Sequence, residues 1–197
     1  MFNANLSGAN LRNADLQRAS FLSADLVAVD LTNANLNNAD LGLADLSNSD
    51  LTGASLSPTY LVNANLTGVN LTNAHCVESN FVSANLTGVN FTGVDLGHAN
   101  LGRANLAGTN LVNARLNGAN LVSAVLTEAD LTGADMTTAN MIDADLTGAN
   151  LSGADLRGTE FKRAKLRRAN LAGADLRGAK VSRFSLRNAN LTGAILK

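Results

Sequence analysis

Apolar and polar positions repeat along this chain every five residues, from Leu6 to Leu196. We name the central position of each unit i. It is Leu in 31 of 39 units, and position i−2 is Ala in 29 of them. Position i−1 is mostly Asn or Asp. A period of five fits neither an α-helix, which repeats about every 3.6 residues, nor a long strand, which alternates. The pattern therefore excludes both as continuous elements.

Each unit predicts a short extended segment followed by a turn. Side chains at i−2 and i point the same way in an extended segment, so a small and a large apolar residue share one interior. Gly or Asn fills position i+2 in more than half of the units, and both residues tolerate positive φ. One layer cannot bury its leucines alone, so coil must stack on coil. The pattern predicts an all-β parallel β-helix, a solenoid, as a single domain over residues 1–197.

The repeat also resembles a known family motif, A(D/N)LXX. Ala9-Asn10-Leu11, Ala14-Asp15-Leu16 and Ala149-Asn150-Leu151 match it directly. On these residues the chain resembles the pentapeptide-repeat family over essentially its whole length. The resemblance implies a right-handed quadrilateral β-helix with four pentapeptides per coil, and about ten coils of about 20 residues here. Many family members add a helix, a loop insertion or a C-terminal dimerisation segment, and this sequence shows none of them.

With coils of that size, residues n and n+20 lie one above the other, so outward side chains sort into columns. The first face is the one centred on Phe21, Leu41, Leu61, Phe81, Leu101, Leu121 and Met141. It carries more large apolar residues outside the core than the other faces do. The candidate partner face consists of Leu22, Leu43, Tyr60, Val62, Val82, Val122 and Ile142. Two interpretations stay open: valine in place of threonine at a β-like position, or a contact surface for a protein partner or a second copy.

Charge divides the chain into two parts. Residues 1–150 carry 4 basic and 13 acidic side chains, whereas residues 151–197 carry 11 basic and 3 acidic ones. The candidate basic patch consists of Arg157, Arg163, Arg167, Arg168, Arg177, Arg183 and Arg187. One interpretation is protection of an open β edge. The other is a patch for nucleic acid, acidic lipid or an acidic protein partner. Without interleaved aromatic residues, binding of nucleic acid is disfavoured.

The stacking rule places arginines above arginines at this end. The three expected column pairs are Arg157/Arg177, Arg163/Arg183 and Arg167/Arg187. Like charges opposite each other destabilise a sheet, and two opposite-charge pairs, Glu160/Lys180 and Asp145/Lys165, offset part of that cost. Phe184 and Ile195 depart from the repeat in the last coil, and we predict that they plug the open end of the core.

No constellation for catalysis is found. Cys76 occupies position i and should face the core, while His75 faces outward, so the two do not form a nucleophile and base. The lone cysteine excludes an internal disulfide and a thiolate zinc site. We therefore expect no enzyme, no catalytic residue, no metal site and no cofactor.

The chain also lacks the signals of export. Met1 and Phe2 run straight into the repeat without a basic or an apolar leader region. No apolar stretch reaches the length of a membrane span. We expect a cytoplasmic protein without a signal peptide.

These observations favour a non-enzymatic structural or interaction module. It would bind a protein partner, or itself, through a flat face or through its basic C-terminal end. The family resemblance implies an alternative, a DNA-mimicking protein that binds DNA gyrase, as in quinolone resistance. The basic end disfavours that alternative. A purely structural, consensus-like repeat array is the third interpretation.

Overall fold

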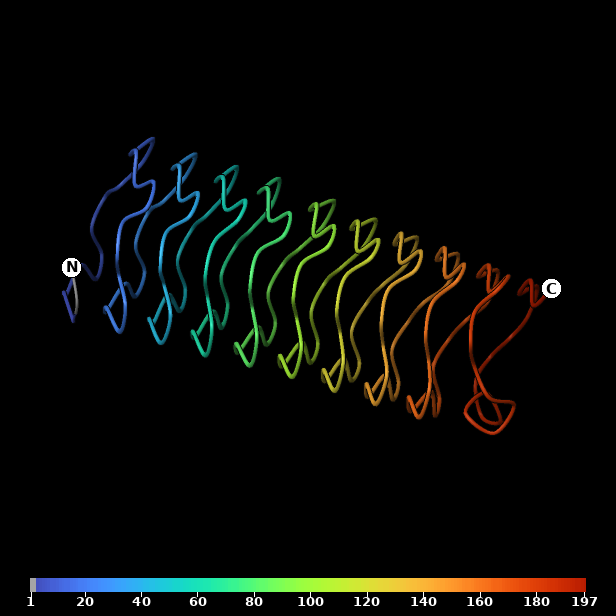
Figure 1. Cartoon of the computed structure of the whole chain (residues 1–197). Helices are drawn as coiled ribbons and strands as arrows, with labels where there is room; N and C mark the ends of the chain where they lie inside the picture. The colour runs from blue at the N-terminus through green and yellow to red at the C-terminus, as the bar shows by residue number, and fades with distance from the viewer. Residues whose placement is uncertain (1–2) are drawn as a thin grey trace.

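The computed structural model describes residues 3–197 as one elongated stack of coils, with the two ends of the chain at opposite ends of the stack (Figure 1). Met1 and Phe2, on which the expectation about a signal peptide rests, lie outside the described residues. Within residues 3–197 there is no helix and no strand longer than a single bridge residue. Nearly every five-residue unit consists of one bridge and one turn.

Parallel bridges between successive coils hold the stack together. They join residue n to residue n+20, from Asn5↔Asp25 to Asp175↔Ile195. At a typical bridge, the Leu26 N–H donates to the Asp45 carbonyl (2.7 Å), and the Asp45 N–H donates to the Ala24 carbonyl (3.0 Å). Both bonds run along the axis of the stack. The all-β parallel β-helix predicted from the repeat is therefore the fold of the chain.

The turns follow the prediction for position i+2. This residue adopts the left-handed conformation both where it is Asn or Gly, as at Asn33 (φ 57°) and Gly53 (φ 67°), and where it is neither, as at Thr138 (φ 56°). Most turns are closed by a bond such as Ala34 N–H to the Leu31 carbonyl (2.9 Å). The stacking of coils thus imposes one backbone geometry on many residue types.

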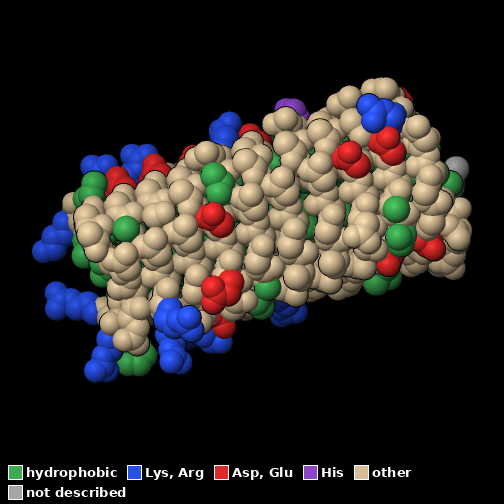
Figure 2. Space-filling view, turned by 180° about the vertical axis from the view of Figure 1, so that it is seen from behind, with side chains coloured by type: hydrophobic (Ala, Val, Ile, Leu, Met, Phe, Trp, Pro, Cys, Tyr) green, Lys and Arg blue, Asp and Glu red, His purple; other side chains and the backbone are tan. Residues whose placement is uncertain are grey.

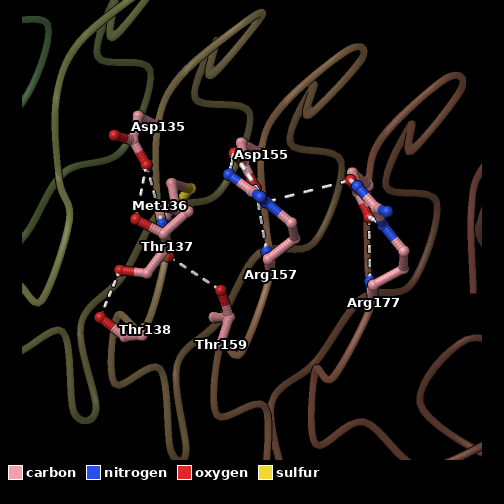
Figure 3. A network of polar contacts seen from close by, with 9 residues as sticks. Asp135, Met136, Thr137, Thr138, Asp155, Arg157, Thr159 and Arg177 are labelled. Atoms are coloured by element: carbon pink, nitrogen blue, oxygen red, sulfur yellow. Dashed lines mark hydrogen bonds and ion pairs between the residues drawn. The ribbon is translucent and has the colours of Figure 1, made fainter. Parts of the chain in front are cut away.

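The interior is built from the residues at i and i−2, which are buried along almost the whole stack. The rings of Phe81 and Phe91 meet edge to face, with centroids 6.4 Å apart, a favourable geometry for an aromatic pair. Where i−2 is Ser or Thr, the hydroxyl is satisfied inside: the Thr159 Oγ1 donates to the Met136 carbonyl (2.8 Å; Figure 3). Buried hydroxyls without such a bond would destabilise the core.

Amide side chains at i−1 link the coils from the outside. The Asn120 Nδ2 donates to the Asn100 Oδ1 (3.0 Å), while the Asn120 Oδ1 accepts from the Val122 N–H (3.2 Å). One side chain therefore satisfies its own turn and also ties it to the coil below. This dual use explains the prevalence of Asn at this position, and Asp supplies the acceptor for the turn in the same way, as where the Asp95 Oδ1 accepts from the Gly97 N–H (3.0 Å).

The regular pattern is interrupted in the last coil, at residues 181–189, which bulge from the stack near the C-terminal end (Figure 1). The bridge expected between Lys165 and Ser185 is missing from the described bridges. Instead, the Leu186 N–H donates to the Ser182 carbonyl (3.4 Å), as in a helical turn. The pattern resumes at Asn190, which bridges to Asn170.

Phe184 explains the bulge. It occupies position i−2, which elsewhere holds only Ala, Ser, Thr or Val because the interior at that position is narrow. An overpacked position forces the backbone to shift. Phe184 accordingly lies outside, 82% exposed.

The predicted core plug is therefore wrong. Phe184 is expelled from the interior, and Ile195, 47% exposed, stands at an outward i−1 position where it bridges to Asp175. The end of the core stays open as a hollow of about 230 Å³, lined in part by Leu176, Val181 and Leu186.

Candidate interaction surfaces

The first face carries an apolar stripe that runs along the axis. Val62, Val82, Val122 and Ile142 occupy its i+1 positions and are half-buried. Their backbone is fixed by the i−1 amides, as where the Val82 N–H donates to the Asn80 Oδ1 (3.1 Å). The side chains are therefore held in a row along the axis, which Gly102 interrupts.

The stripe is widest near the N-terminal end. Leu43 is 58% exposed and Tyr60 48% exposed. The Leu43 N–H donates to the Val62 carbonyl (2.9 Å), so Leu43 and Val62 lie side by side on successive coils. Leu22 lies one coil below the buried Gly42, close enough that a Cβ at position 42 would lie 3.1 Å from its Cδ1. The seven residues of the candidate partner face thus lie together on one face. Five of them form the i+1 column, and Leu43 and Tyr60 lie beside that column near its N-terminal end.

One apolar residue outside the core was missed by the sequence analysis. Val125, 38% exposed, stands at i−1 on the neighbouring face, where other coils have Asn, Asp, Ser or Lys. An apolar residue at a normally polar position was the available signal.

The basic end is prominent on the surface: Lys and Arg side chains gather at the C-terminal end, at the left of Figure 2. Much of this charge is paired along the columns. Lys165 bonds to Asp145 (2.9 Å), and Lys180 bonds to Glu160, as predicted. Arg163 binds Asp143 through two nitrogens, a pair that the 20-residue stacking rule could also have found.

Arg157 and Arg177 form a chain of ion pairs with two aspartates (Figure 3). Each arginine lies 2.6 Å from the aspartate two residues before it, Asp155 and Asp175 respectively, and the Arg157 Nε also lies 4.0 Å from Asp175. The hydrogen bond from Arg157 holds the pKa of Asp155 below its usual value, and that from Arg177 does the same for Asp175. This like-charge column is therefore neutralised, which the sequence analysis missed.

The two other predicted arginine columns, Arg163/Arg183 and Arg167/Arg187, are not formed. Residues 181–189 leave the stack, so Arg183 and Arg187 no longer continue the ladder above Arg163 and Arg167. The Arg168 N–H bonds to the Asn188 carbonyl (3.0 Å), one residue beyond the regular partner. Within the described part of the chain, Arg167, Arg168, Arg183 and Arg187 have no ion pair. These four are the uncompensated members of the candidate basic patch.

The bulge leaves a groove of about 1400 Å³ beside the last complete coil. Its apolar lining includes Ala164, Leu166 and Phe184. The groove is also lined by six cations and two carboxylates. They are Lys162, Arg163, Lys165, Arg167, Lys180, Arg187, Asp145 and Glu160. Both carboxylates already bind lysines, so the surface is available to anions.

The His75-Cys76 pair has no catalytic geometry. Cys76 is fully buried, and burial together with the Asp95 carboxylate raises the pKa of its thiol. Over residues 3–197, no group of three or more His, Cys, Asp or Glu side chains is placed to hold a metal ion. The same residues contain no helix of the length and apolarity needed to cross a membrane.

Comparison with known proteins points to one family. The model for pentapeptide repeats matches the chain in 8 copies, over residues 1–33, 24–61, 59–97, 99–137, 139–178 and 169–197. No curated protein matched the chain in a sequence comparison.

Solved structures of the same kind resemble it. HetL, a pentapeptide repeat protein involved in heterocyst differentiation regulation in the cyanobacterium Nostoc sp. strain PCC 7120, is 35% identical. The match covers 100% of this chain and 91% of HetL, with a TM-score of 0.52. Full-length QnrB1, a plasmid-mediated fluoroquinolone resistance protein, is 21% identical over 98% of this chain and 92% of its own, with a TM-score of 0.53. At that identity the likeness concerns the fold alone.

Proposed function

The chain belongs to the pentapeptide-repeat family, whose members fold as right-handed β-helices, and from that premise we propose that it is a non-enzymatic module that binds a protein partner. The likeness to HetL supports the proposal, because HetL takes part in regulation, a role that proteins often perform through binding. The filled core of the stack supports it as well, since catalysis normally needs a concave pocket with convergent reactive groups.

The apolar stripe of the first face carries this proposal. Leu43 and Tyr60 are each about half exposed and lie beside a row of half-buried valines, although the same positions on other faces are mostly polar. Contiguous apolar surface of this kind marks interaction sites. Aromatic residues such as Tyr60 are also enriched where partners dock. The occupant is a protein surface with a matching apolar ridge, from a partner or from a second copy.

A matched pair of variants tests the stripe. Val82→Lys places a charge in its centre, while Val112→Lys makes the same change at the same repeat position on another face. We expect the wild-type protein to self-associate, as measured by light scattering, or to retain a partner in pull-downs. Mass spectrometry would identify that partner, and the complex would then be reconstituted from the purified proteins. Val82→Lys should weaken that association at least about tenfold, as expected for a charge buried at a contact, and Val112→Lys should not. A monomeric wild type that loses no partner on Val82→Lys contradicts the proposal.

A second candidate function is binding to DNA gyrase as a mimic of duplex DNA. The stacked carboxylates of the first coils favour it, since Asp25 bridges to Asp45 and Asp30 to Asp50. Repeated negative charge along a rod imitates a phosphate backbone. A supercoiling assay with purified gyrase decides this alternative: inhibition that is lost in Asp30→Asn/Asp50→Asn supports it, and unchanged supercoiling rejects it. If both candidates fail, the structural repeat array remains.

A further inference from the structure

The groove beside residues 181–189 runs along an edge of the β-helix where the backbone bonds to the next coil are missing, although Ala164 and Leu166 on that edge are themselves buried. One coil earlier, the N–H groups of Asp143 and Leu146 donate to Lys162 and Lys165 in the next coil (3.0 and 2.8 Å). The Ala144 carbonyl accepts from the Lys165 N–H (2.9 Å). The equivalent groups at the groove are the N–H of Arg163, the N–H of Leu166 and the carbonyl of Ala164. Among the described residues, none of these three groups has a hydrogen-bond partner.

These groups lie on one edge, in the spacing that a parallel neighbour would satisfy. The missing neighbour is the segment around Ser185, which Phe184 has pulled away: the Ser185 N–H bonds to the Ser182 Oγ instead (3.0 Å). Unpaired backbone groups at a sheet edge readily pair with another chain. The edge therefore offers a place for one short extended segment.

The side chains around the edge select the charge of that segment. Arg167 and Arg187 are exposed, have no ion pair in the described part of the chain and line the groove. Lys162 lines it too, at the end of the apolar stripe. The carboxylates in the lining, Asp145 and Glu160, are engaged by Lys165 and Lys180. The surplus of positive charge favours an acidic segment.

We propose that this groove binds an extended acidic segment of a protein partner, which adds to the β-helix as a parallel strand along residues 163–167. Strand addition derives its affinity from main-chain hydrogen bonds and its specificity from alternate side chains. The inference rests on the proposed function only in treating the chain as a protein-binding module. The apolar stripe takes no part in it.

The column rule gives the sequence of the segment. The residue beside Lys165 is acidic, the next turns inward onto Leu166 and is apolar, and the next lies beside Arg167 and is acidic. The acidic residue beside Lys165 repeats the ladder that the chain itself uses, in which Asp145 lies beneath Lys165, as Asp143 lies beneath Arg163. The exposed ring of Phe184 supplies a second apolar contact at the side of the groove.

Fluorescence anisotropy with short labelled peptides tests the inference on the full chain. A peptide that alternates Glu and Leu should bind at least about tenfold tighter than a peptide of the same composition with its Glu and Leu residues in separate blocks, because only alternation suits a strand. Methylation of the backbone nitrogen that faces the Ala164 carbonyl should weaken binding about tenfold, as loss of a buried hydrogen bond does.

Variants of the protein test whether the peptide binds at this groove rather than elsewhere on the chain. Arg167→Glu should weaken binding at least about tenfold, since it turns an attractive contact into a repulsive one. Arg103→Glu, the same charge change at an exposed arginine of a covered coil, should leave it unchanged. Val82→Lys should leave it unchanged as well, so failure here is distinct from failure of the apolar stripe. Circular dichroism spectra identical to the wild type ensure that Arg167→Glu is folded.

Three results would overturn the inference. Equal binding of the block peptide means that charge alone attracts the ligand. Equal binding of the N-methylated peptide means that no strand is added. Tighter binding of a single-stranded oligonucleotide of equal charge means that the groove serves nucleic acid.

Discussion

At the residue scale, the dominant constraint is the left-handed backbone at position i+2. Gly and Asn meet it at little cost, but this chain also places Arg, Glu, Ser, Leu and Thr there, including Arg163 (φ 61°), Glu128 (φ 57°) and Leu43 (φ 59°). The left-handed region costs an ordinary residue about 1–2 kcal/mol. The hydrogen bonds between coils and the burial of the neighbouring leucine outweigh that cost. Backbone strain is therefore spread over many i+2 positions, and replacing a strained residue there by one that tolerates positive φ should stabilise the fold.

Thr138 tests this account because a β-branched residue is least suited to positive φ (56° here). Thr138→Asn should stabilise the chain by about 0.5–1 kcal/mol, since Asn tolerates this conformation without adding the backbone freedom of Gly. The reverse change, Asn113→Thr at a residue with φ 55°, should destabilise it by a similar amount. Chemical denaturation measures both. Equal stability of all three proteins would show that the strain is relaxed elsewhere.

Cys76 gives a second prediction at this scale. Its thiol is fully buried and its pKa is raised, first by burial and then by the Asp95 carboxylate. Because the thiolate is the reactive form, labelling by a thiol reagent should require unfolding. The labelling rate in the folded protein should match the unfolding rate and rise with denaturant. Rapid labelling in buffer alone would contradict the buried position.

At the scale of the element, each coil is a series of five-residue units whose outward residues interact mainly with the coils before and after it. Asp155, Asp175, Arg157 and Arg177 form the most connected of these column networks. Because these groups are partly exposed, each pair adds little alone, and the value of the network lies in neutralising stacked like charges. The same rule explains why Lys165 and Lys180 each stand above a carboxylate.

This network predicts how stability depends on pH. The pKa values of Asp155 and Asp175 are lowered from 3.8 in the folded chain, chiefly by hydrogen bonds from Arg157 and Arg177. A lowered pKa gives stabilisation that is present above the unfolded value and lost as pH falls through the folded value. The melting temperature should therefore decrease as pH falls below about 4. In Asp155→Asn/Asp175→Asn the decrease should be smaller, and an unchanged decrease would assign it to other carboxylates.

At the scale of the whole molecule, the chain is a one-dimensional stack. Each coil contacts only its neighbours, so stability is the sum of local terms and the ends are its weakest points. The first coil and the last coil have partly exposed leucines, such as Leu6 and Leu191, where inner coils have fully buried ones. The bulge at residues 181–189 adds an interior break in the bonding pattern. Local opening should begin at these places.

Hydrogen exchange measures this gradient. The amides of Arg163 and Leu166, which have no described partner, should exchange at least about tenfold faster than those of Asp143 and Leu146, which are bonded to the next coil. Amides of central coils such as Leu106 should exchange most slowly. Equal protection of Leu166 and Leu146 would mean that the edge at the groove is covered in solution.

The repeat alone determined the interior, the turns and the stacking, because a period of five with Ala and Leu at fixed positions leaves the backbone few other ways to bury them. Which residues share a column followed from the coil size that the family resemblance implied, and hence so did the pairs Asp145–Lys165 and Glu160–Lys180. The path of residues 181–189 was decided only by the tertiary structure, since the register rule cannot tell whether a large residue at i−2 is accommodated or expelled. The narrow interior expels Phe184, and that single steric conflict opens the groove, frees the backbone of Leu166 and separates arginines that the repeat would have stacked.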